Sequence, residues 1–167
     1  MAAVAPKLDT DELVRLGARI QALNAEYAHI IDEDRLEHWP ELFTERGRYR
    51  VITRENRELG LSVSLMYCDG RGMLADRIVA MRTANIFEPH VYCHTFSALK
   101  IVSAADNQIR TQSNFQIIRT MAEGDMSIFA CGKYLDLIVE DAGTMRFAER
   151  IVVLDSRRID TLLVIPI

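Results

Sequence analysis

Two histidines with three residues between them, His90 and His94, are the first candidates for chemistry in this chain. On a helix this spacing would place both imidazoles on one face, where they could share a metal ion. Pro89 precedes the pair, however, and Val91 and Cys93 alternate with the residues between them as in a strand. Four residues of a strand span about 13 Å, which is too far for two ligands of one ion. The spacing therefore predicts no metal site here.

His94 taken alone suggests a different role. It shares a strand face with Tyr92 and Phe96, and an imidazole on the concave face of a curved sheet could act as a general base beside a carboxylate such as Asp32. The alternative is a buried histidine that is satisfied by a hydrogen bond or lies at a subunit contact. One histidine on one strand favours the structural role. The sequence thus assigns no catalytic residue, and it leaves His94 and Asp32 as the alternative pair.

The cysteines and glycines support neither a cofactor nor a metal site on this chain. Cys68, Cys93 and Cys131 are odd in number and widely spaced, so a disulfide framework or a zinc site is not expected. We expect reduced thiols that fill small apolar spaces in strands. The Cys93-His94 pair lacks the Cys-x-His and Cys-x-x-His pattern of a Rieske cluster. No glycine-rich phosphate loop occurs, which excludes the common nucleotide sites.

Composition limits the partners. The 167 residues include 49% hydrophobic and 26% charged residues, which is ordinary for one globular domain. The net charge of -4 and the absence of a basic stripe argue against nucleic acid. No apolar run approaches the roughly 20 residues that span a bilayer, and the first residues do not resemble a signal peptide. We expect a cytoplasmic chain with a flexible tail over residues 1–8 and a single domain over 9–167.

A long amphipathic helix is expected first. Asp9 or Thr10 can cap it, and six apolar residues follow at steps of three and four, which is one face held for about five turns: Leu13, Leu16, Ile20, Leu23, Tyr27 and Ile30. We expect this face on the concave side of a sheet. The acidic turn Asp32-Glu33-Asp34 is interpreted as a solvated turn that pairs with Arg35, Arg46 or Arg48. Trp39 with Leu42-Phe43 is expected to anchor the core, with Pro40 inside a short helix or turn.

Strands dominate the rest of the chain. Alternating residues predict short strands at 48–53 and 61–67, a helix at about 71–86, and long strands at about 91–104, 108–121, 126–140 and 144–155. A last short strand is expected at 159–165. Tight turns between long neighbouring strands indicate an antiparallel meander. The fold class is therefore α+β, with a curved, strongly twisted and mostly antiparallel sheet wrapped around the N-terminal helices.

These segments together resemble a known family, the small (beta) subunit of aromatic-ring-hydroxylating dioxygenases. The resemblance covers nearly the whole chain, and it rests on Tyr27, Ile31-Asp32, Trp39, Leu42-Phe43, Tyr49, Leu74-x-Asp76-Arg77, Glu88-Pro89, His94, Ser113-Asn114-Phe115, Glu149-Arg150 and Leu154-Asp155. The terephthalate dioxygenase branch looks most similar, through Trp39-Pro40, Arg82-x-Ala84-Asn85-Ile86, Asp160-Thr161-Leu162 and Ile165-Pro166. The chain departs from the common pattern at Val91-Tyr92-Cys93, where many relatives carry arginines.

The resemblance implies a cone-shaped fold of the SnoaL-like or cystatin-like roll type, which scytalone dehydratase and nuclear transport factor two share. It also implies a non-catalytic structural subunit of an oxidoreductase that degrades aromatic acids. The small subunits would form a homotrimer beneath large (alpha) subunits, as half of a hetero-hexamer. The Rieske [2Fe-2S] cluster and the mononuclear iron would belong to the large subunit.

The alternative within the same fold is a stand-alone dehydratase, isomerase or cyclase that uses His94 and Asp32 as acid and base. An open polar pocket with these two residues in hydrogen-bond reach would favour that enzyme. A cone plugged by Tyr92, Phe96 and Phe115 would favour the structural subunit. A ligand-binding module without chemistry is a third class, because one fold hosts many functions.

Overall fold

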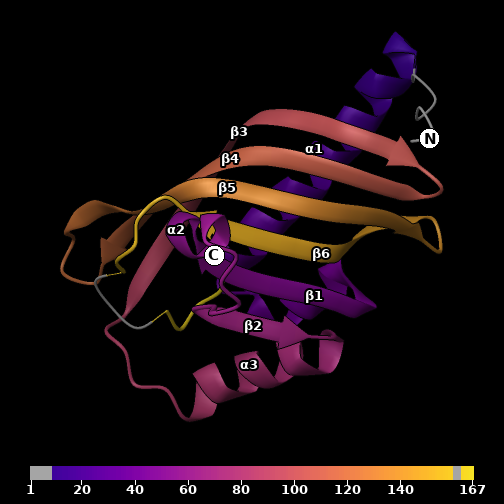
Figure 1. The fold of residues 1–167 in the computed structure, drawn as a ribbon. Coiled ribbons are helices and arrows are strands. Elements are labelled where there is room, and N and C mark those ends of the chain that lie inside the picture. Colours follow the sequence, from indigo (N-terminus) through magenta and orange to yellow (C-terminus); the bar gives the residue numbers. More distant parts are fainter. Residues whose placement is uncertain (1–8, 160–162) are drawn as a thin grey trace.

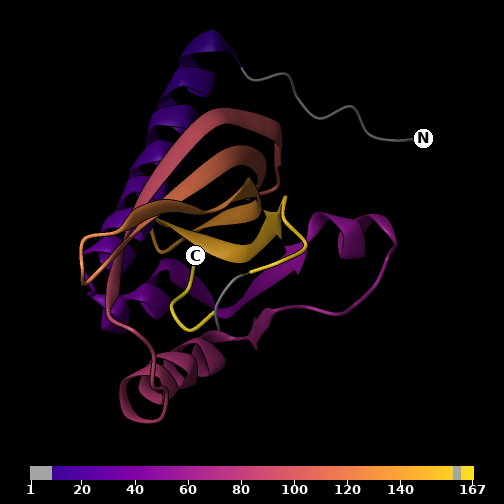
Figure 2. The same cartoon turned by 90° about the vertical axis from the view of Figure 1, so that its left-hand side faces the viewer.

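The computed structural model describes residues 9–159 and 163–167 and has the expected α+β architecture. A six-stranded sheet in the order β2-β1-β6-β5-β4-β3 curls around one long helix (Figures 1 and 2). The strands are β1 (Phe43–Thr53), β2 (Met66–Asp69), β3 (His90–Ala105), β4 (Gln108–Met121), β5 (Met126–Asp141) and β6 (Thr144–Leu154). The tail expected at residues 1–8 lies outside the described residues.

The helices are α1 (Thr10–Asp32), the 3-10 helix η1 (Leu36–Leu42), α2 (Arg54–Glu58) and α3 (Arg71–Thr83). Asp9 caps α1 by accepting from the Glu12 amide at 2.8 Å, and the Glu12 carboxylate accepts from the Asp9 amide at 3.1 Å. This reciprocal box satisfies two backbone donors that a helix start leaves open. α1 then runs diagonally across the concave side of the sheet to Asp32 (Figure 1).

Strands β3 to β6 form the antiparallel meander that the sequence predicts, with each expected range within two residues of the observed one. β1 pairs with β6 in parallel and with β2 in the antiparallel direction. The pairing register places Ser113 of β4 opposite Tyr134 of β5, and Asp136 of β5 opposite Arg150 of β6. Because side chains of paired residues point to the same face, the concave side carries polar groups among its aromatic ones.

The core lies between α1 and the sheet. Ile20, Leu23 and Tyr27 of α1 are buried, and Leu16 is partly buried against the same cluster. Leu13, at the exposed start of the helix, remains 42% accessible. The expected anchor is confirmed: Trp39 is fully buried and packs edge-on against Phe43 and Tyr49, with its ring centroid 5.5 Å and 5.0 Å from theirs.

The strand predicted at 61–67 is wrong except at its end, because β2 contains only Met66–Asp69. Arg50 explains the difference. Its guanidinium donates to the Ser62 carbonyl at 2.9 Å and to the Ser64 hydroxyl at 2.6 Å. A side chain, and not a neighbouring strand, therefore holds this segment. The large apolar residues Leu61, Val63 and Leu65 stay exposed.

The C-terminal strand and the second long helix also need correction. α3 ends at Thr83, three residues before the predicted end. Of the strand predicted at 159–165, residues 160–162 lie outside the described residues, and 163–165 form no strand. Residues 163–167 are instead buried in the core without strand pairing. The Tyr27 and Tyr49 hydroxyls both donate to the Ile167 main-chain oxygen, at 2.8 Å and 2.6 Å.

The three cysteines differ in their surroundings. All three are free thiols in strands, as expected, but only Cys68 is a buried filler, whereas Cys93 and Cys131 are exposed. The alternation of β3 and β5 places these two on the convex side of the sheet, opposite to the face that carries His94 and Tyr134. Burial raises the pKa of the Cys68 thiol, although the Arg77 charge opposes the shift.

This difference gives a first testable expectation. In the native chain, Cys93 and Cys131 should react quickly with a thiol reagent, and Cys68 should react only as fast as the fold opens, because it is shielded and protonated. Mass spectrometry of timed alkylation would assign each site. Rapid modification of Cys68 in the folded chain would contradict the burial described here. Denaturant should make all three sites react alike.

Candidate functional site

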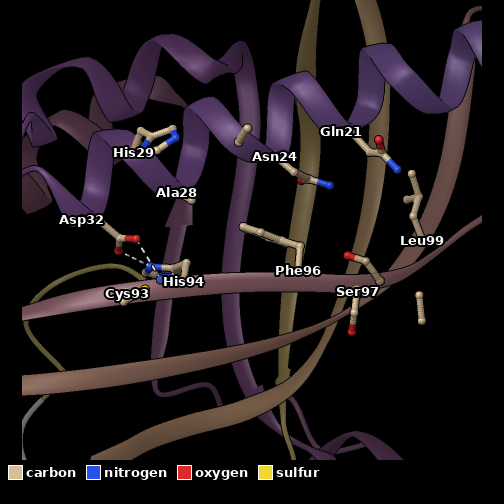
Figure 3. A pocket seen from close by; sticks show the side chains of 13 residues that line it. Gln21, Asn24, Ala28, His29, Asp32, Cys93, His94, Phe96, Ser97 and Leu99 are labelled. Carbon is tan, nitrogen blue, oxygen red and sulfur yellow. Dashed lines mark hydrogen bonds and ion pairs between the residues drawn. The ribbon is translucent and has the colours of Figure 1, made fainter. Parts of the chain in front are cut away.

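A pocket of about 450 Å³ lies between α1 and the first two strands of the meander, as Figure 3 shows. One face of α1 lines it, with residues again spaced by three and four: Gln21, Asn24, Ala25, Ala28, His29 and Asp32. β3 contributes His94 and the segment from Phe96 to Leu99, and β4 contributes Ser113. α1 therefore contacts the rest of the chain through two faces. An apolar face packs in the core, and a face of smaller and more polar side chains lines this pocket.

Asp32 and His94 meet at one end of the pocket (Figure 3). The Asp32 carboxylate lies 2.5 Å from Nδ1 of His94 through one oxygen, and its other oxygen accepts from the His94 backbone amide at 2.8 Å. The His94 side chain is fully buried, and that of Asp32 is 19% exposed. The interpretation of Asp32 as part of a solvated turn is therefore wrong. It joins the end of α1 to the middle of the sheet.

The rest of the acidic turn pairs as expected only at Glu33. Asp34 forms an ion pair with Arg82 of α3 at 2.8 Å, and Glu33 pairs with Arg35 at 3.0 Å. Arg82 also binds Glu37 at 2.9 Å. The hydrogen bonds from this guanidinium lower the pKa of the Glu37 carboxyl. Only Arg35 was among the partners predicted for the turn.

The Asp32 contact selects the tautomer of the neutral imidazole. A carboxylate oxygen only accepts hydrogen bonds, so Nδ1 carries the proton that it shares with Asp32. In neutral histidine, Nε2 is then a lone-pair acceptor. Within residues 9–159 and 163–167, this buried Nε2 has no hydrogen-bond partner. An imidazole that is oriented by a carboxylate and has an unpartnered second nitrogen is the arrangement from which a general base can act.

A buried ion pair lies next to the pocket on the concave face. Arg150 donates to both oxygens of Asp136 at 2.9 Å and to Oδ1 of Asn24 at 2.5 Å. Its guanidinium carbon lies 4.2 Å from the ring centroid of Tyr27 and 4.3 Å from that of Tyr134. Burial works to lower the Arg150 pKa, but the Asp136 carboxylate outweighs it and the pKa rises. Desolvation holds the pKa of Tyr134 well above its usual range.

Sequence reasoning missed this ion pair, although a signal for it exists. Arg150 lies on the same strand face as Val152 and Leu154, which point into the core. Asp136 likewise lies on the same strand face as Tyr134 and Ile138. A charged residue at an inward position on each of two strands that are consecutive in the chain indicates a buried pair.

The sequence analysis distinguishes an open polar pocket, which favours an enzyme, from a plugged cone, which favours a structural subunit. The structure has features of both. Asp32 and His94 are within hydrogen-bond reach beside a pocket, as the enzyme alternative requires. Tyr92 and Phe115 are buried in the core, but Phe96 only forms a wall of the pocket and does not close it. Pocket shape alone therefore leaves the structural and the acid–base roles both possible.

The structure brings no cluster of three or more histidine, cysteine, aspartate or glutamate side chains together in its described part. His90 and His94 do not converge: Nδ1 of His90 lies 2.7 Å from the Glu88 carbonyl, while His94 faces Asp32. These donor sets do not fit a Rieske cluster or a mononuclear iron site. In the same described residues, no helix has the length and apolar character needed to cross a membrane.

Comparison with known proteins gives a consistent result. The family model for the ring hydroxylating beta subunit matches residues 26–161. The anthranilate 1,2-dioxygenase small subunit of Burkholderia cepacia is 40% identical over 89% of this chain and 92% of its own length. Beta subunit 1 of the terminal oxygenase component of terephthalate 1,2-dioxygenase from a Comamonas species is also 40% identical, over 89% of this chain and 97% of its own.

Solved structures agree in fold. A crystal structure of a beta subunit assigned to an aromatic-ring-hydroxylating dioxygenase of Novosphingobium aromaticivorans has a TM-score of 0.84 and 37% identity, and it covers 93% of this chain and 100% of its own. A protein from the same organism, assigned as a scytalone dehydratase, has a TM-score of 0.69 at 18% identity, over 89% of each chain. The second likeness shows the cone-shaped fold alone, as expected from the sequence.

Proposed function

The chain belongs to the ring-hydroxylating dioxygenase beta-subunit family, and from this premise we propose that it is the non-catalytic small subunit that holds large oxygenase subunits in place. The observation that carries the proposal is the match along the chain at 40% identity to small subunits of two such dioxygenases. Both are named for an aromatic acid, anthranilate or terephthalate. An aromatic carboxylic acid is therefore the proposed substrate class of the complete enzyme, which would act in the cytoplasm.

The donor sets support assigning the redox centres to a partner. Ring hydroxylation needs an iron that activates dioxygen and a source of electrons. A Rieske cluster takes two cysteines and two histidines, and the described part of this chain brings no such set together. The large subunit is thus proposed to carry both the Rieske cluster and the mononuclear iron, while this chain sets the distance between neighbouring large subunits.

We also propose a homotrimer, within a complex of three large and three small subunits. The apolar residues on both faces of β6 add little support, because Val153 is buried in the single chain, only 6% exposed, where α2 lies beside β6. Exposed apolar residues on the convex face of β3 and β5 give a better reason to expect a trimer. Val91, Met126 and Ile128 remain 58%, 69% and 66% exposed on β3 and β5, where an apolar group calls for cover.

Reconstitution tests the structural role. We expect the purified chain alone, with reductase and ferredoxin, to turn over no aromatic acid. Activity should appear when the chain is combined with its Rieske-containing large subunit, and complex mass should indicate three copies of each chain. The matched control is the large subunit alone under the same conditions. Turnover by the isolated small chain, or full activity of the large subunit without it, would overturn the proposal.

A second candidate function rests on one observation. The 2.5 Å contact between Asp32 and Nδ1 of His94, beside a pocket, is sufficient for proton-transfer chemistry without a cofactor. This geometry favours a dehydratase, isomerase or cyclase activity over other independent roles. It predicts that His94 acts on a bound molecule in the chain itself, and not through assembly of a larger complex.

A further inference from the structure

We propose that the pocket between α1 and β3 binds a small hydroxylated aromatic molecule, whose hydroxyl donates a hydrogen bond to Nε2 of His94. The residues that line the site all belong to this chain. The proposal does not depend on whether His94 transfers a proton, and it goes beyond the structural role in an oxygenase. Three features carry it: unpartnered buried polar atoms, an apolar wall, and an open entrance.

The first feature is the buried polar groups in the pocket lining. The His94 side chain is 0% exposed and Ser113 is 1% exposed. For both Nε2 of His94 and Oγ of Ser113, the described residues supply no hydrogen-bond partner. Leaving such a group unsatisfied costs about 1–3 kcal/mol, so native proteins usually provide a partner. Both residues line the pocket, so a molecule bound there can supply the missing partner after a small shift of the lining.

The polarity of these atoms selects the chemistry of the ligand. The Nδ1–H group of His94 donates to Asp32, so in the neutral imidazole Nε2 is the acceptor. The ligand must therefore offer a donor there. A hydroxyl fits best, because Oγ of Ser113 can either donate or accept. A carboxylate at the same place would fit poorly, because neither its oxygens nor Nε2 carries a proton to donate. It would also be repelled by the Asp32 carboxylate.

The second feature is the apolar wall. Phe96 projects from β3 toward α1 (Figure 3). On the helix side, Ala25 and Ala28 line the pocket. The two alanines leave the space that larger side chains would fill. Leu99 adds a further apolar surface. A flat ring beside Phe96 would bury apolar area and gain an aromatic contact of about 0.5–1.5 kcal/mol. A volume of about 450 Å³ is within the usual range for small-molecule pockets.

The third feature is the entrance. β3 loses register with β4 between Ser97 and Lys100, and Ala98 in this bulge has a φ of 51°. A residue other than glycine rarely adopts this conformation, and such bulges often lie beside functional sites. Ser97, Ala98 and, across from them, Ala25 are exposed. A small molecule can therefore reach the pocket without unfolding of the chain.

Calorimetric titration of the full chain tests the proposal with para-nitrophenol, phenol and catechol. We expect saturable binding of at least one of them, with one molecule per chain. Para-nitroanisole is the matched probe, because its methoxy group keeps the ring and removes the donor. It should bind about tenfold more weakly or worse than para-nitrophenol, the loss expected for one buried hydrogen bond.

Two variants place the binding in this pocket. His94→Asn keeps an N–H donor for Asp32 and removes the acceptor at Nε2, and Ala25→Leu narrows the entrance from an exposed helix position. Each should weaken para-nitrophenol binding about tenfold or more. Ala22→Leu, on the same helix but outside the pocket lining, is the control and should bind like wild type.

The outcomes are distinct from those of the reconstitution experiment. Failure of all three phenols to saturate the chain would mean that the pocket holds only water and would overturn the proposal. Equal binding of para-nitroanisole, or binding that Ala25→Leu leaves unchanged, would overturn it as well. Neither result bears on whether the chain supports the large subunit, which activity of the assembled complex measures separately.

Discussion

Replacing Arg150 by methionine is expected to lower the free energy of unfolding by about 3–5 kcal/mol, as is usual when one partner of a buried ion pair is removed. Both side chains of the Arg150–Asp136 pair are 0% exposed. The substitution leaves the Asp136 carboxylate without its two hydrogen bonds at 2.9 Å and leaves Oδ1 of Asn24 without its donor. Urea unfolding followed by circular dichroism measures the loss.

Two further variants make the result specific. Arg48→Met removes the same chemical group from an exposed pair with Glu149, where Arg48 is 51% accessible, so its cost should stay below about 1 kcal/mol. The double variant Arg150→Met with Asp136→Leu should recover most of the stability, because no charge is then left unpaired. A small loss for Arg150→Met alone would mean that water or a neighbouring group can reach Asp136.

The fold was largely predictable because its elements follow simple periodicities. The steps of three and four from Leu13 to Ile30 predict α1, and alternation predicts the four long strands. The same alternation failed at Leu61–Leu65. A period of two shows that a segment can be extended, but it does not show that a neighbouring strand exists to pair with it. Here the Arg50 side chain takes the hydrogen bonds that a strand would have made.

The site was predictable in its residues but not in its arrangement. His94 was selected from its strand face, and Asp32 as a nearby carboxylate. The two are 62 positions apart in sequence, and their contact depends on where α1 ends against β3. Periodicity also cannot say which face of a strand another element covers, which is why Cys93 was expected inside and is exposed. The pocket itself depends on two alanines, Ala25 and Ala28, whose importance appears only once the helix faces β3.

His94→Ala is expected to lower the stability of the small subunit and the yield of the assembled oxygenase, while turnover per assembled complex stays close to that of wild type. The substitution removes the donor at Nδ1 and leaves an Asp32 oxygen without its 2.5 Å partner. Losing the partner of a largely buried group costs about 1–3 kcal/mol. The rate of the chemical step should not change with this substitution, because the mononuclear iron and the Rieske cluster that supplies its electrons are proposed to lie on the large subunit.

The measurement compares kcat per complex with the amount of complex recovered, for wild type, His94→Ala and Thr95→Ala. Thr95 is the neighbouring residue on β3 and is exposed, so its variant reports the effect of a generic change in the same strand. If His94 were a general base in the reaction, its loss would reduce kcat by about 10²–10⁴-fold with the complex intact. That result would reject the structural role of His94 and support the acid–base alternative, since a destabilised scaffold reduces the number of complexes and not the rate of each one.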